Sequence, residues 1–190
     1  MAGTLTVQNL QGPSSGANAN KIIIPSGQTI DASAGTLVPS AGSVVAVHKA
    51  FSNTDQTITS ATLVNITGLS ITMTPKNANN LIVLQSVATA NCVHVLGLTF
   101  LKDGAKTTTT SGTNTDEEDV HVTAYLSAQS SWITPHPLLH YETAGSTSER
   151  TYTVAATSGW NGTPYVQRIN DRASNDMAST SWFVLWEIAQ

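Results

Sequence analysis

The sequence predicts an all-β protein, with an extended N-terminal arm followed by an antiparallel β-sandwich. Of the 190 residues, 28 are Thr and 20 are Ser, whereas only 11% are charged, against about 25% in an average soluble protein. Thr and Val favour pleated strands, and helical segments rich in Ala, Leu, Glu and Lys are almost absent. No stretch longer than two turns carries apolar residues at helical spacing. This composition disfavours a helical bundle, a coiled coil and a large α/β enzyme.

Residues 1–42 differ in character from the rest of the chain. They are small and polar, with short apolar runs at Leu5–Val7, Ile22–Ile24 and Leu37–Val38. Segments this short bury apolar surface only against another chain or a partner. The composition also fits a disordered polar tail. Three consecutive isoleucines in an uncovered tail would promote aggregation, and this favours an ordered arm.

Residues 43–190 show the pattern of an antiparallel β-domain. Strand-like segments recur at intervals of about 8–12 residues, which is typical of a sandwich or barrel and not of βαβ units. Turn residues such as Thr67-Gly68 and Asp103-Gly104 separate them. The expected strands are Val44–Phe51, Ala61–Ile66, Leu69–Thr74, Leu81–Ala88, Val93–Leu101, Val120–Ser127, Leu138–Glu142, Arg150–Thr157, Tyr165–Ile169 and Trp182–Ile188.

The last of these strands is apolar on both faces. Its central residues are Trp182, Phe183, Val184, Leu185 and Trp186, and successive side chains of a strand point to opposite faces. A half-exposed strand alternates apolar with polar residues, which this one does not. We predict that these five residues lie in the core or at a subunit interface. A second subunit is the favoured cover for the outer face, and the chain's own loops or arm are the alternative.

Charge and cysteine content disfavour several partners. The formal net charge is −4, and the eight basic residues are scattered, which argues against a nucleic-acid groove. The single cysteine, Cys92, cannot form an intrachain disulfide or a cysteine-based zinc site. No run approaches the ~18 consecutive apolar residues of a membrane helix. We therefore expect no nucleic-acid or membrane partner.

No motif in the sequence predicts catalysis. His136 and His140 have the spacing of a zinc helix, but Pro135 and Pro137 forbid a regular helix there. On a strand the two histidines would lie about 13 Å apart, too far for one metal ion. The acidic run at 116–119 lacks the pattern of a calcium loop. Motifs for nucleophiles, dinucleotides and phosphates are also missing, so we expect no enzyme activity, no cofactor and no metal site.

Two aromatic residues are candidates for surface recognition. Trp160 and Tyr165 flank a predicted turn at Asn161-Gly162. An exposed indole on a turn is costly unless it is packed or used for binding. One interpretation is carbohydrate recognition through Trp160 and Tyr165, and the other is that Trp160 covers the end of the sandwich.

Segments distributed over nearly the whole chain carry a resemblance to a known family. They are Thr4–Gly12, Ser15–Ile22, Pro25–Asp31, Gly68–Pro75, Phe100–Gly104, Arg168–Asn170 and Ser181–Ile188. These segments resemble tail-fibre-like structural proteins of marine tailed bacteriophages, including those of cyanobacteria. The resemblance implies a trimeric β-sandwich, of the jelly-roll or tumour-necrosis-factor-like kind, that is carried on the virion. It transfers no catalytic residue.

The resulting hypothesis is a short homotrimeric fibre or knob on a tailed-phage virion. Residues 1–42 would attach it to other virion proteins or intertwine with sister arms. Residues 43–190 would form the knob and contact host-surface glycans. A full tail fibre has a longer shaft, so a head fibre or a capsid decoration protein that stabilises the head is an alternative. A glycan-degrading depolymerase and a free lectin-like domain are two further alternatives.

Overall fold

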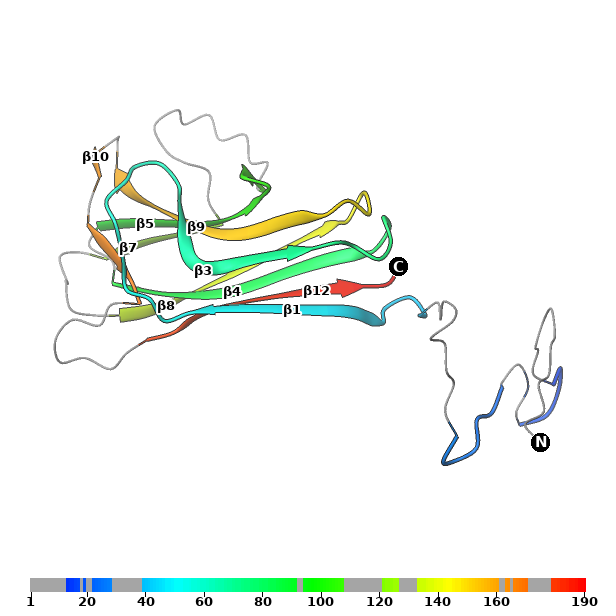
Figure 1. Cartoon of the computed structure of the whole chain (residues 1–190). Helices are drawn as coiled ribbons and strands as arrows, with labels where there is room; N and C mark the ends of the chain where they lie inside the picture. Colours follow the sequence, from blue (N-terminus) through cyan, green and yellow to red (C-terminus); the bar gives the residue numbers. More distant parts are fainter. Residues whose placement is uncertain are drawn as a thin grey trace, which may run out of the picture. The chain divides into compact units, whose positions relative to one another are not determined.

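The computed structural model describes ten parts of the chain. They are residues 13–17, 19, 22–28, 39–91, 94–107, 121–126, 133–160, 163–164, 166–170 and 179–190. The chain divides into two units, Met1–Val38 and Pro39–Gln190, and Figure 1 shows the strands of the second. All described strands belong to the second unit, and the described residues contain no helix.

Strands make up most of the second unit. The described strands are β1 (Val44–Ser52), β2 (Gln56–Ile58), β3 (Val64–Met73), β4 (Leu81–Asn91), β5 (His94–Lys102), β6 (Ala105–Lys106), β7 (Val122–Leu126), β8 (Ile133–Thr143), β9 (Arg150–Trp160), β10 (Thr163–Pro164), β11 (Gln167–Ile169) and β12 (Ser181–Ile188). They form two antiparallel sheets. Sheet A contains β1, β12, β4 and β8, with the short strands β11 and β2. Sheet B contains β3, β9, β5 and β7, with the short strands β6 and β10.

The eight longer strands pair in a nested pattern. The first pairs with the last (β1 with β12), the second with the seventh (β3 with β9), the third with the sixth (β4 with β8) and the fourth with the fifth (β5 with β7). This is the pattern of one long antiparallel hairpin folded over on itself. Pairing of β12 with β4 and of β9 with β5 then completes the two layers.

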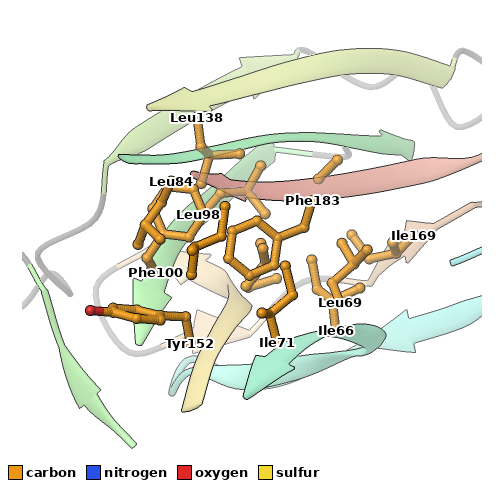
Figure 2. Packing of buried hydrophobic residues seen from close by; sticks show 14 of the residues in the cluster. Ile66, Leu69, Ile71, Leu84, Leu98, Phe100, Leu138, Tyr152, Ile169 and Phe183 are labelled. Carbon is orange, nitrogen blue, oxygen red and sulfur yellow. The ribbon is translucent and has the colours of Figure 1, made fainter. Parts of the chain in front are cut away.

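The hydrophobic core lies between the two sheets (Figure 2). Phe100 of β5 and Phe183 of β12 are fully buried, and their ring centroids lie 5.4 Å apart across the gap. Leu84 of β4 and Leu98 of β5 are also fully buried beside them. Alternate side chains of β3, β4, β5, β9 and β12 supply most of this core, as the period-two pattern of the sequence predicts. The all-β class expected from composition is therefore confirmed for the described residues.

The turn predicted at Thr67-Gly68 is wrong, because β3 runs continuously through it. The register of β3 against β9 shifts between Asn65 and Ser70, and Gly68 has a φ of 83°. A Cβ atom on Gly68 would lie 3.2 Å from Cβ of Ser52. Glycine therefore forms a bulge here and lets the strand pass close to the end of β1.

Strand β8 begins five residues before the Leu138 start that the sequence predicts. Pro135 and Pro137 lie within it, although proline cannot donate to a β-ladder. Among the described strands, β8 pairs with β4 only, so it is an edge strand. Proline is tolerated at an edge because the missing N–H falls on the unpaired side.

Candidate interaction face

The side of sheet A that points away from the core carries mostly apolar side chains. The pairing register aligns these side chains in rows across β1, β12, β4 and β8. We call the twelve positions of three successive rows the outer face: Phe51, Trp182, Val87 and Pro137; then Lys49, Val184, Gln85 and Leu139; then Val47, Trp186, Val83 and Tyr141.

Both flanks of the outer face are strongly exposed. Phe51 on β1 and Tyr141 on β8 are each 69% exposed, and Leu139 is 63% exposed. For an aromatic side chain of about 200 Å², this exposure leaves about 140 Å² in water. Covering that area would contribute about 3 kcal/mol for each ring, at ~25 cal/mol per Å². Such a surface is favourable only when another surface covers it.

The five residues singled out on β12 divide between the two sides of sheet A. Phe183 and Leu185 are fully buried in the core. Trp182, Val184 and Trp186 lie on the outer face and are half-buried within the single chain. Their place at a subunit interface stays a prediction, but the structure adds the neighbours that would share it. The sequence did not assign Phe51, Leu139 or Tyr141 to this face, because their place on it depends on the pairing register.

The outer side of sheet B has the opposite character. The hydroxyl oxygens of Ser70 and Thr153 lie 2.9 Å apart, and those of Thr72 and Thr151 lie 2.8 Å apart. These pairs form a ladder of hydroxyl groups between β3 and β9. Such groups are compatible with water on their exposed side. The two outer sides of the sandwich therefore differ in polarity, apolar on sheet A and hydroxyl-rich between β3 and β9 of sheet B.

A polar cluster joins the two sheets beside β7 and β8. The rings of His121 and His140 meet edge to face, with centroids 5.1 Å apart. The Tyr152 hydroxyl donates to Oε1 of Glu142 at 2.5 Å. The same carboxylate oxygen lies 2.7 Å from Nζ of Lys102, which makes an ion pair. The charges of the cluster are thus paired internally.

Burial determines how the cluster ionises. Burial, together with the neighbouring His140, lowers the pKa of His121 to about 4. Burial also lowers the pKa of His140, an effect that Glu142 opposes and Lys102 reinforces. The pKa of Tyr152 is raised by burial and by its hydrogen bond to Glu142. At neutral pH the cluster therefore holds two neutral imidazoles, a neutral phenol and one ion pair.

This cluster is suited to holding the sheets together and offers little for catalysis. Neither histidine contacts a serine or cysteine nucleophile in the described contacts, and Nε2 of each is buried without a hydrogen-bond partner. Among the described residues, no three His, Cys, Asp or Glu side chains come together as a metal site would require. His136 shares the inner side of β8 with His140, as expected from a strand, and its Nε2 pairs with Thr134 at 2.9 Å.

Several sequence-based candidates lie outside the described residues. Tyr165, Cys92 and the acidic run at 116–119 are among them. Trp160 ends β9, but its side chain also lies outside the described part. Surface recognition through Trp160 and Tyr165 therefore stays a prediction.

No protein-family model matches the chain, and no curated protein matches it either. In the described part of the chain there is no helix with the length and hydropathy to cross a membrane. The fold and its two contrasting outer sides are therefore the basis for assigning a function.

Proposed function

We propose that the chain is a structural protein of a tailed-bacteriophage virion, a short homotrimeric fibre or knob. The observation that carries the proposal is the nested strand pairing, with β1-β12-β4-β8 in one layer and β3-β9-β5-β7 in the other. A doubled-over hairpin of eight strands is the topology of a jelly roll, a fold used by viral structural domains and by lectins. Because a fold alone does not define function, the residues must supply the rest.

The resemblance of residues 4–31 to phage fibre proteins supports the location on a virion. The division into Met1–Val38 and Pro39–Gln190 is consistent with separate roles for the two units. In this proposal, the N-terminal unit attaches to other virion proteins or intertwines with sister arms. The C-terminal unit forms the knob that projects from the particle.

The proposed mechanism is multivalent display and involves no catalysis. Three weak binding sites held on one rigid trimer bind a repetitive surface more tightly than one site does, because the later contacts form at high effective concentration. Host-surface glycans are the proposed ligand, since a hydroxyl-rich surface with few charges suits neutral polar partners. The internal pairing of the cluster around Glu142 gives no support to a hydrolytic role.

Labelling of purified particles tests this proposal. Antibodies raised against residues 39–190 should bind gradient-purified virions at the tail or at a head fibre, and their Fab fragments should block adsorption to the host. Labelling spread over the capsid shell, with adsorption unchanged, would instead assign the decoration role. Absence of the chain from purified particles would overturn the virion assignment.

A further inference from the structure

We propose that a second copy of this chain packs on the outer face of sheet A. This inference deepens the proposed function and rests on it, since it names the surface that joins the subunits of the knob. Its starting point is the group of exposed side chains on that face, of which Phe51, Leu139 and Tyr141 are the most exposed.

The outer face is large enough for a stable interface. Four strands about 4.8 Å apart, each contributing the five residues that three rows span at ~3.4 Å, cover about 330 Å² in projection, and the next row extends this to about 450 Å². Projecting side chains raise the accessible area towards the ~800 Å² that each partner buries in a standard interface. Leu81 and Ile188, which pair in the next row, continue the same surface. Contiguous apolar patches of this size on soluble proteins mark interaction sites.

The chemistry of the face favours a copy of itself over a different partner. Lys49 is the only charged residue among the twelve positions, and Gln85 is the only other polar one. Depletion of charge and enrichment of aromatic residues are typical of interfaces between identical subunits. A face with a single charged residue cannot be electrostatically complementary to a highly charged partner. Faces of identical subunits, in contrast, complement one another around a threefold axis, where each face buries apolar area against both of its neighbours.

Both edges of sheet A are poorly suited to pairing with an added strand, which leaves the outer face as the surface for association. Pro135 and Pro137 of β8 have no backbone N–H groups, so an added strand could not form a complete ladder of hydrogen bonds with this edge. At the other edge, the register of β1 shifts between Val44 and Ala46, which is an irregularity of the kind that protects exposed edges. Neighbouring copies therefore pack through the outer face, and not by extending the sheet.

The exposed outer residues of β3 in sheet B keep their contact with water in such an assembly. In the hydroxyl ladder of Ser70, Thr72, Thr151 and Thr153, the exposed members Ser70 and Thr72 offer little apolar area to bury. The assembly therefore has a defined polarity, with sheet A towards the neighbouring subunits. Surfaces that recognise a host lie on the sheet B side or on the loops.

Sedimentation velocity over a dilution series of the full-length chain tests the interface. We expect the wild type to be oligomeric at micromolar concentration. Leu139→Asp introduces a charge on the outer face, at a position 63% exposed and therefore outside the core, and should weaken association at least tenfold. Thr72→Asp is the matched control, since it adds the same charge at an exposed position of sheet B and should leave association unchanged.

Circular dichroism and thermal melting identify any variant that fails to fold. In that case Phe51→Ser at the other flank, also exposed, replaces Leu139→Asp. A monomeric wild type overturns the inference, and so does a folded outer-face variant that associates as tightly as the wild type. The second result would mean that the arm or another surface holds the subunits together.

The test separates this inference from the proposed function. Oligomers that dissociate with Leu139→Asp, together with virions that lack the chain, would leave the interface standing and overturn the virion assignment. A monomer found on virions would do the reverse.

Discussion

At the scale of single residues, the pair His121 and His140 shows how the fold controls protonation. The Phe100 backbone N–H lies 3.4 Å from Nδ1 of His121 and donates to it, and the Thr99 hydroxyl lies 2.9 Å from the same atom. Nδ1 therefore accepts a hydrogen bond, and the proton of the neutral ring lies on Nε2. Adding a second proton would place a donor against the Phe100 N–H and a charge beside His140.

This geometry predicts that the domain loses stability as the pH falls. The folded pKa of His121 is about 4, below the ordinary value of 6.5, so the unfolded chain binds protons that the folded chain does not. The stability present above pH 6.5 is therefore lost as the pH decreases from 6.5 towards 4. Replacing His121 by Gln should flatten the dependence of melting temperature on pH over this interval. Identical profiles for the wild type and His121→Gln would show that this site does not contribute.

At the scale of secondary-structure elements, most long strands could be predicted from the sequence because their side chains alternate along the chain. The strands β1, β4, β9 and β12 lie close to their expected positions. The strands β2, β6 and β10 have two or three residues each, too few for a periodic pattern. The early start of β8 was missed because the tolerance of proline depends on which strands have only one neighbour.

The turn wrongly predicted at Gly68 was the other error, and comparing Gly68 with Gly104 gives a prediction with its own control. Gly68 and Gly104 both have a φ of 83°, but only Gly68 has neighbours within 4 Å of an added Cβ. Gly104→Ala should cost about 1 kcal/mol of unfolding free energy for the left-handed backbone alone. Gly68→Ala should cost more, about 2–3 kcal/mol, because Ser52 and the Phe51 carbonyl must also move. Equal losses in urea denaturation would contradict the close approach of β3 to β1.

The candidate face could be predicted only in part from the sequence. Two-sided apolarity identified β12, because Trp182, Phe183 and their neighbours leave no polar side. The flanking positions Phe51 and Tyr141 lie on strands whose exposed side is defined by pairing with β12 and β4. Both pairings join these residues to partners more than 50 positions away, and no local pattern encodes them.

At the scale of the whole molecule, the chain combines a sandwich of contrasting outer sides with a separate N-terminal unit. A charged share of 11% means that solubility depends largely on hydroxyl and amide groups. Charge-based contacts are screened in salty water, whereas burial of apolar area persists there. The outer face of sheet A is therefore the surface best suited to hold subunits together, and the proposed knob depends on it.

The mass of the intact protein in solution tests this central claim most directly. Sedimentation equilibrium of the full chain at micromolar concentration should give three times the 19.9 kDa of one chain. A folded species of 19.9 kDa, with Trp182 and Trp186 unchanged in fluorescence on dilution, would contradict the account, since the outer face would then lie open to solvent or beneath the chain's own residues.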